Sequence, residues 1–486
     1  MEKKDWLKIK SYTHLTPKIQ SHNQDWIRSY VKDKEKVKSH RFYPMLHYTI
    51  VDKKFQRPKS SNRKELGRIP KKKPREIFYS NHLDSHVYSY YGDILNHKLN
   101  DQYSLDTSLM ESVIAYRSIP FNKTRNKCNI DFAHEVFDYI KKSDATELSA
   151  ICLDVSKYFD SIDHKHLKKL WSNLLGRIDL PIDHYKVFKA ITKFSYLEIS
   201  DIIKLTPENG VNKLSLLKRK SLDSFFEDGK SFQEAVIGKG LIRLNKNDFG
   251  IPQGSPISAV LSNLYLLEFD KLMVKLAKLY NGLYRRYSDD IVFICNPKFI
   301  EKINKTIIAY LTSELSLIIQ DKKTQRVDFS RSSSQENWNT TLNVEGEKYY
   351  GRPLTYLGFD FDGKTIRIKQ KSISGYYRKM KRLIRRAAFY ANKANQRKKR
   401  DETNGGDPWI YKSRIYRLKS HLGAKKKKIE NKVFWGNYLS YAYNASQIMK
   451  EPKIKKQLRN HWRIIEKNIK YFNNKYDLES QPSSPK

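Results

Sequence analysis

The segment Leu283–Cys295, LYRRYSDDIVFIC, places two adjacent aspartates, Asp289 and Asp290, between two short strand-like runs. Runs this short and this rich in β-branched and aromatic residues predict strands, and the polar Ser-Asp-Asp between them predicts the tight turn of a β-hairpin. Adjacent carboxylates on a rigid support are costly unless a cation shares their charge, which favours a hard, oxygen-seeking ion such as Mg²⁺. An ordinary Asp-rich turn is the alternative.

The composition points to a polyanionic partner. The chain has 486 residues, enough for two or three domains, and its 94 Lys and Arg against 52 Asp and Glu give a net charge of +42. Nucleic acid is the commonest polyanion, and an anionic membrane surface is the competing interpretation. There is no run of eighteen apolar residues and no signal-peptide core at the N-terminus. Three scattered cysteines without zinc spacing predict buried thiols in a reducing, cytoplasmic compartment.

A strongly basic segment lies upstream. Lys53–Arg75 holds eleven basic residues against one acid and resembles a hairpin that presents cations to phosphates. Within it, Lys73 and Arg75 are the candidates for contact with a triphosphate. A solvated basic loop or a nuclear-localisation-like run is the alternative. Arg117, which follows a short apolar run, is a second phosphate candidate.

A third carboxylate follows a predicted buried strand. In LSAICLDVSKYFDSID, Ala150–Leu153 reads as that strand, and Asp154 stands at its end. A carboxylate there, beside a hairpin that carries two more, can cage two divalent ions. For Asp160 and Asp163 we prefer the alternative role, capping the helix expected from His164.

A loop rich in glycine and proline precedes a predicted helix at Phe249–Lys271, FGIPQGSPISAVLSNLYLLEFDK. Gly250, Pro252, Gly254 and Pro256 exclude helix, and such a loop lets the backbone approach a base or sugar closely. Gln253 supplies an amide there. The region between Lys165 and Asp248 is expected to be mostly helical, and Arg326–Tyr350 to be a surface insertion.

The C-terminal part is basic and helical. Residues 371–400 contain twelve Lys or Arg and no acid, while apolar residues recur at helical spacing. This excess favours a helix that tracks phosphates over a merely solvated face. The nucleic-acid-binding candidates are Arg378, Lys381, Arg382, Arg385 and Arg386.

Three motifs follow one another along the chain: a strand that ends in Asp, a Gly/Pro loop with Gln, and a Tyr-x-Asp-Asp hairpin. In this order they resemble the palm of reverse transcriptases. The matching motifs are LDVSKYFDSID, GIPQGSPIS and YSDD, followed by Lys323-Thr324 and Tyr356-Leu357-Gly358, over roughly residues 65–365. The resemblance implies an α+β right-hand polymerase fold with fingers, a ferredoxin-like palm and a helical thumb. The implied domains are a helical N-terminal extension (1–60), fingers (61–148), a palm (149–365) with a helical fingers insertion at about 165–248, a basic thumb (366–478) and a disordered tail (479–486).

The same resemblance implies RNA-directed DNA polymerisation with two Mg²⁺ ions, or Mn²⁺ in their place. Asp154 and Asp289 would bind both ions, with Asp290 and the Val155 carbonyl in support. Phe159 would exclude a ribose 2′-hydroxyl, Gln253 and Gly254 would touch the incoming dNTP, and Lys323 would protonate pyrophosphate. Tyr356, Leu357 and Gly358 would form the primer grip.

Within this family the chain is most similar to bacterial defence-associated reverse transcriptases, which are related to the retron and group II intron enzymes. It carries Pro-Gln-Gly-Ser-Pro-Ile-Ser, lacks the Asn-Ala-x-x-His and Val-Thr-Gly signatures of retron enzymes, and shows no endonuclease, integrase or RNase H pattern. This similarity implies antiphage defence with a dedicated noncoding RNA, and no membrane partner. Retron-like or group II intron-like activity, protein-primed or non-templated synthesis, a non-catalytic RNA-binding scaffold and homo-oligomerisation stay open.

Overall fold

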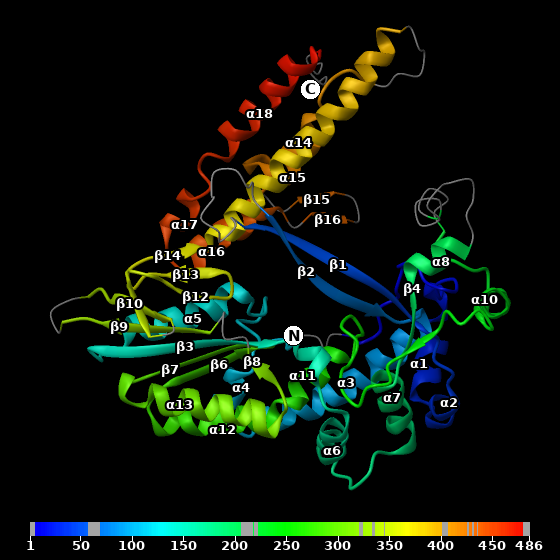
Figure 1. Cartoon of the computed structure of the whole chain (residues 1–486), viewed down its shortest axis with the longest axis horizontal. Helices are drawn as coiled ribbons and strands as arrows, with labels where there is room; N and C mark the ends of the chain where they lie inside the picture. Colours follow the sequence, from blue (N-terminus) through cyan, green and yellow to red (C-terminus); the bar gives the residue numbers. More distant parts are fainter. Residues whose placement is uncertain are drawn as a thin grey trace. The chain divides into compact units, whose positions relative to one another are not determined.

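The computed structural model describes residues 5–56, 69–205, 217, 222–319, 324–332, 336–344, 346–400, 407–424, 427–429, 432–434 and 436–479. Helices and strands are mixed along the chain, as the α+β prediction expects (Figure 1). The chain divides into two compact units. The first comprises Met1–Arg117, Leu153–Phe293 and Glu301–Thr324, and the second comprises Ser118–Cys152, Ile294–Ile300 and Gln325–Lys486.

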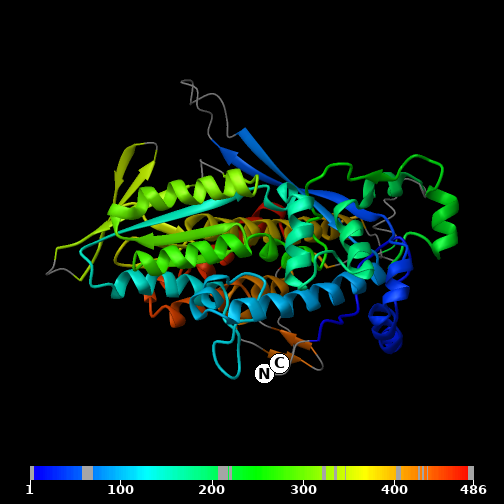
Figure 2. The same cartoon turned by 90° about the horizontal axis from the view of Figure 1, so that it is seen from below.

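A four-stranded sheet in the order β2-β1-β4-β5 organises the N-terminal part of the first unit. Strands β1 (Met45–Gln56) and β2 (Ile69–Tyr79) pair antiparallel from Leu46↔Tyr79 to Gln56↔Ile69 and form a long two-stranded arm (Figures 1 and 2). The strand pairing of the predicted basic hairpin is therefore confirmed, and residues 57–68 lie outside the described residues. Strand β4 (Ser195–Glu198) pairs parallel with β1, and β5 (Arg243–Leu244) completes the sheet.

One secondary-structure prediction for this unit is wrong in part. The expected N-terminal helices exist, but residues 45–56 form β1 instead of helix. The described part of region 165–248 is mostly helical, as predicted, and also contributes the short strands β4 and β5. Leu46 and Leu197, on the paired strands β1 and β4, lie in one buried apolar cluster with Leu15, Phe225 and Phe232, so tertiary packing recruits these short segments into a sheet.

A second group of strands in the first unit carries the acidic hairpin. Strands β6 (Leu283–Tyr287) and β7 (Asp290–Cys295) flank a turn at Ser288-Asp289, which confirms the predicted hairpin. Strand β7 lies between β6 and β3 (Glu147–Ser156), and β8 (Ile318–Ile319) pairs with the end of β3. Helix α12 packs against β6 (Figure 1).

Helices surround these strands, and side-chain caps fix where several of them begin. Asp163 accepts a hydrogen bond from the backbone N–H of His166 (2.7 Å) and so caps α6, as predicted. The helices are α1 (Gln24–Lys32), α2 (Lys34–Ser39), α3 (His82–Ser104), α4 (Thr107–Ser112), α6 (His164–Leu174), α7 (Ile182–Thr192), α8 (Ile199–Leu205), α10 (Gly229–Val236), α11 (Ser258–Tyr265), α12 (Leu267–Leu279) and α13 (Pro297–Ala309), with short turns η1 (Ser21–Asn23), η2 (Tyr158–Ser161) and η3 (Tyr310–Glu314).

In the second unit, the first half of β3 begins a sheet in the order β3-β9-β10-β11. Strands β9 (Gln325–Ser330), β10 (Asn339–Val344) and β11 (Glu347–Tyr350) occupy the segment expected to be a surface insertion, so that prediction is wrong. The reason is packing: Val327 and Phe329 of β9 are buried, although Ser and Asn dominate the segment.

The rest of the second unit combines small sheets with helices. Strands β12 (Leu354–Tyr356), β13 (Phe359–Phe361) and β14 (Ile366–Ile368) form one antiparallel sheet whose second turn contains Asp362-Gly363, and β15 (Lys427–Ile429) pairs with β16 (Lys432–Phe434). Helices α14 and α18 run side by side (Figure 1). The helices are α5 (Asn129–Lys142), α14 (Gln370–Lys398), α15 (Lys412–Lys419), α16 (Tyr438–Ile448), α17 (Pro452–Lys456) and α18 (His461–Tyr476), with the turn η5 (His421–Gly423).

Two further observations concern the whole chain. Among the described helices, none is both long and apolar enough to cross a bilayer. Of the three cysteines, Cys295 is buried, Cys152 is half-buried and Cys128 is exposed, which corrects the expectation of three buried thiols.

Candidate active site

The acidic hairpin turn lies directly beside the strand that carries Asp154. The backbone N–H of Val155 donates a hydrogen bond to the carbonyl oxygen of Asp289 (3.2 Å). Asp154 is half-buried between buried Leu153 and Val155, so its side chain lies on the opposite face of β3 from theirs. Asp289 and Asp290 are also half-buried. Asp154 is thus brought beside Asp289 and Asp290, which are far from it in the sequence.

These carboxylates have the chemistry for a hard divalent cation, but the side chains as placed do not form a complete ligand set. Within the described residues, no group of three or more His, Cys, Asp or Glu side chains could hold a metal ion as it stands. The backbone arrangement therefore fits the predicted ligands Asp154, Asp289 and Asp290, while the ion site itself stays a prediction.

A buried ion pair supports the turn of the hairpin. Arg286 and Asp270 have fully buried side chains, and Arg286 donates two hydrogen bonds to the Asp270 carboxylate, from Nε (2.7 Å) and Nη2 (2.5 Å). Arg286 Nη1 also donates to the carbonyl oxygen of Ser288 in the turn (3.1 Å) and to Asn263 Oδ1 (3.2 Å). Although burial disfavours the charged form, the Asp270 carboxylate raises the pKa of Arg286 well above its usual value.

The same network fixes an unusual backbone conformation in the turn. Ser288 adopts a left-handed conformation with φ of 59° and is buried. Its hydroxyl lies 3.1 Å from the Tyr116 hydroxyl, and the N–H of Ile114 donates to the carbonyl of Arg286 (3.0 Å). The segment before Arg117 therefore holds the turn from a second side.

Sequence reasoning missed this support. Arg286 and Asp270 belong to different elements, β6 and α12, and each reads as an ordinary surface charge. A usable signal was present: Tyr284, Arg286 and Ser288 alternate along the strand, so an arginine falls on a face that also carries an aromatic residue. A charge on such a face requires a buried partner.

The Gly/Pro loop joins the segment that carries Phe159 to the base of the β1–β2 arm. The N–H of Ile251 donates to the carbonyl of Phe159 (2.9 Å), and the N–H of Phe78 on β2 donates to the carbonyl of Gln253 (3.0 Å). Gly254 has a φ of 127°, and a Cβ there would lie 2.4 Å from the Phe78 carbonyl oxygen. Only glycine permits this close approach. Phe159 and Gln253, the predicted nucleotide contacts, are therefore positioned by one connected backbone network.

A histidine ties three strands together at the base of the arm. His47 on β1 contacts Glu76 on β2 through Nε2 (2.7 Å) and Glu198 on β4 through Nδ1 (2.7 Å). Arg75, next to Glu76, is exposed, as a phosphate-binding role requires. Lys73 also lies in β2, but its side chain is outside what the structure describes.

The other predicted site residues are placed as follows. Arg117 donates to Asn100 Oδ1 (2.9 Å) and to the carbonyls of Met110 (2.8 Å) and Val113 (2.7 Å), and its guanidinium lies over the Tyr103 ring. These contacts give it a structural role. Lys323 lies outside the described residues.

Two predicted groups belong to the second unit. Tyr356 ends β12 and is buried, and Leu357 and Gly358 form the turn to β13 with φ of 43° and 90°. The five candidate cations of α14 are all exposed. Their assigned roles, as primer grip and as nucleic-acid contacts, stay predictions.

Comparison with solved structures finds distant similarity to telomerases. No protein-family model matches the chain. Apo telomerase from Candida tropicalis, truncated from its C-terminal domain, is 15% identical with a TM-score of 0.39 over 71% of this chain, which spans only 59% of that chain. Telomerase from Candida albicans, solved with a fragment of telomeric RNA, is 11% identical with a TM-score of 0.38 over 96% of this chain and 71% of that one.

Proposed function

We propose that this chain is an RNA-directed DNA polymerase. The observation that carries the proposal is the hydrogen bond between Val155 N–H and the Asp289 carbonyl, which joins the Asp154 strand to the Asp289-Asp290 turn. The sequence motifs at these positions resemble those of reverse transcriptases, and the net charge of +42 suits a nucleic-acid partner.

Each part of the site has a defined task in this proposal. Asp154, Asp289 and Asp290, with the Val155 carbonyl, would hold two Mg²⁺ ions, or Mn²⁺ in their place. Such ions lower the pKa of a primer 3′-hydroxyl and neutralise charge on a triphosphate. The Arg286–Asp270 pair keeps the hairpin turn rigid. Phe159 would pack beneath the sugar of the incoming dNTP, Gln253 and Gly254 would contact that nucleotide, and Arg75 with Lys73 would bind its phosphates.

Template and biological role form the finer part of the proposal. By resemblance of the loop motif PQGSPIS, the template would be a dedicated noncoding RNA and the role antiphage defence. The telomerase structures with bound telomeric RNA fit an RNA partner as well, although their similarity is too low to carry the argument. A non-catalytic RNA-binding scaffold is the second candidate, favoured by the lack of a ready three-ligand metal group among the described residues.

The test is incorporation of labelled dNTPs by the purified chain with Mg²⁺ on an RNA template annealed to a DNA primer. A parallel reaction uses RNA that co-purifies with the protein. We expect DNA synthesis that falls at least about 100-fold in Asp289→Asn and in Asp154→Asn, because loss of a metal ligand removes several kcal/mol of transition-state stabilisation.

The matched control is Asp179→Asn, which removes a carboxylate that is 83% exposed and pairs only with Lys168 at 3.5 Å. It should polymerise as the unaltered chain does. No incorporation on any template, with RNA still bound, would establish the scaffold instead.

A further inference from the structure

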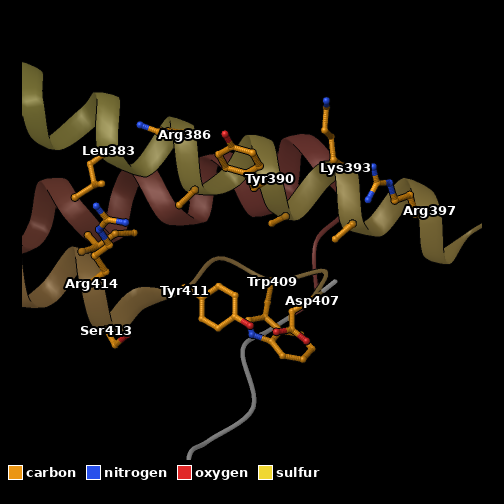
Figure 3. Close-up of a pocket in the computed structure, with 14 residues that line it drawn as sticks. Leu383, Arg386, Tyr390, Lys393, Arg397, Asp407, Trp409, Tyr411, Ser413 and Arg414 are labelled. Atoms are coloured by element: carbon orange, nitrogen blue, oxygen red, sulfur yellow. The ribbon is translucent and has the colours of Figure 1, made fainter. Parts of the chain in front are cut away.

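The second unit contains a cavity of about 830 Å³ between helix α14 and the segment from Asp407 to Ile415 (Figure 3). This volume lies within the range of small-molecule sites and is large enough for a nucleotide. Small residues of α14, Ala387, Ala391 and Ala394, line part of the cavity. They leave room on a helix that is otherwise covered by long side chains.

The charge of the cavity lining favours an anion. Four cationic side chains line it, Arg386, Lys393 and Arg397 from α14 and Arg414 from α15, against the one carboxylate Asp407. Figure 3 shows Arg414 of α15 near Leu383, whereas Lys393 projects from α14 on the side away from Trp409 and Tyr411. Arg386, Lys393 and Arg414 are exposed and can be reached by a phosphate.

Three aromatic rings that line the cavity independently favour a ligand with a flat ring, such as a nucleic-acid base. Tyr390 of α14 lines the cavity on one side, and Trp409 and Tyr411 line it on the other (Figure 3). The rings of Trp409 and Tyr411 are 6.4 Å apart and tilted by 58°, so they are not stacked face to face. Tyr390 and Tyr411 are exposed by 57% and 50%, so a ligand can reach their rings. Aromatic faces beside cations are the combination that binds bases and phosphates of single strands.

We infer that this cavity binds one unstacked nucleotide of a single-stranded nucleic acid. Its base would lie between Tyr390 and the Trp409–Tyr411 pair, and its phosphates against Arg386 and Arg414. The cavity flank of α14 differs from the flank that carries Arg378, Lys381, Arg382 and Arg385, because these residues fall elsewhere on the helix at about 100° per residue. The inference rests on the nucleic-acid partner of the proposed function and adds a base-binding subsite to it.

The test measures binding of fluorescein-labelled 12-nucleotide oligo(U) RNA and oligo(dT) DNA to the full chain by fluorescence anisotropy. Tyr390→Ala and Trp409→Ala should each weaken binding by about 5- to 140-fold, the range for loss of one stacked base. Tyr390→Phe keeps the ring and should bind normally. Tyr350→Ala is the matched control, because Tyr350 is an 80% exposed aromatic residue of the second unit and does not line the cavity.

Salt dependence separates the two kinds of contact. Arg386→Gln and Arg414→Gln should each reduce the slope of log K against log salt by about 0.7, whereas Tyr390→Ala should leave the slope unchanged. The oligonucleotide with the larger Tyr390 dependence identifies RNA or DNA as the source of the bound strand. Circular dichroism melting checks that every variant is folded.

Normal affinity in folded Tyr390→Ala and Trp409→Ala would overturn the inference. Displacement of the 12-mers by free UTP or by hexaglutamate, with the same dependence on Tyr390, would also overturn it and assign a free nucleotide or an acidic peptide. The assay needs no catalysis, and Asp289→Asn should bind normally. A chain that makes no DNA but keeps its Tyr390-dependent binding would lose the proposed function and retain this subsite.

Discussion

Replacement of Arg286 by methionine tests whether the buried ion pair supports the acidic hairpin. Methionine keeps most of the side-chain volume but leaves the Asp270 carboxylate fully buried, with the Tyr284 hydroxyl as a remaining donor (2.6 Å). It also removes the donor to the Ser288 carbonyl. Removing one partner of a buried pair costs about 3–5 kcal/mol. We therefore expect the melting temperature to fall on the order of 10 °C.

Two companion variants make this prediction specific. Arg286→Met/Asp270→Leu removes both charges and should recover most of the lost stability, because no uncompensated charge remains buried. Lys271→Met is the matched control. Lys271 follows Asp270 in the sequence, and its ammonium pairs with the half-exposed Glu268 at 2.8 Å, so the loss of this surface pair should cost at most about 1 kcal/mol.

The stabilities of these variants are compared at pH 8. The assay is urea unfolding followed by tryptophan fluorescence, with the m-value compared between variants. A loss below about 1 kcal/mol at pH 8, or a double variant no more stable than the single one, would refute the reasoning.

Three further predictions concern the loop, the sugar contact and acid stability. Gly254→Ala should cost about 2–4 kcal/mol and abolish DNA synthesis, because its Cβ meets the Phe78 carbonyl. Gly238 also has a positive φ, but an added Cβ would meet nothing within 4 Å, so Gly238→Ala should cost only backbone strain. Equal urea midpoints for the two variants would contradict this. Phe159→Val should raise ribonucleotide relative to deoxyribonucleotide incorporation by at least about tenfold in single-nucleotide extension, and unchanged discrimination would remove Phe159 from the sugar site. Burial lowers the pKa of His14 from 6.5 to about 3, so its contribution to stability is complete above pH 6.5 and falls by about 1.4 kcal/mol per pH unit below it. His14→Gln should flatten that acid limb in urea titrations, and an unchanged limb would show that other groups control it.

Local patterns predicted those parts of the site that depend on local structure. The Ser-Asp-Asp turn and the Asp154 strand are each specified by a few consecutive residues, so the hairpin and the strand could be expected in advance. Their adjacency came from resemblance to a family, and the Val155–Asp289 hydrogen bond now gives it a physical basis.

Features that depend on distant partners could not be predicted in the same way. The Arg286–Asp270 pair joins a strand to a helix, and the sequence around one residue does not indicate that the other is its partner. The strands between residues 325 and 350 were hidden by a Ser- and Asn-rich composition, because only Val327 and Phe329 supply the buried alternation of β9. Strand β1 was hidden similarly, since it is stabilised by β4, which lies far along the chain.

The hydrogen bond from the Phe78 N–H to the Gln253 carbonyl couples the register of strand β2 to the position of the loop that carries Gln253, a predicted nucleotide contact. Arg75 lies three residues before Phe78 in this strand, a span of about 10 Å with no intervening joint. One residue inserted between them would turn Arg75 to the opposite side of the sheet while the bond still held the loop in place. Each residue inserted or deleted between Arg75 and Phe78 would therefore change the distance between the Arg75 cation and the loop by one residue of strand, about 3.3 Å.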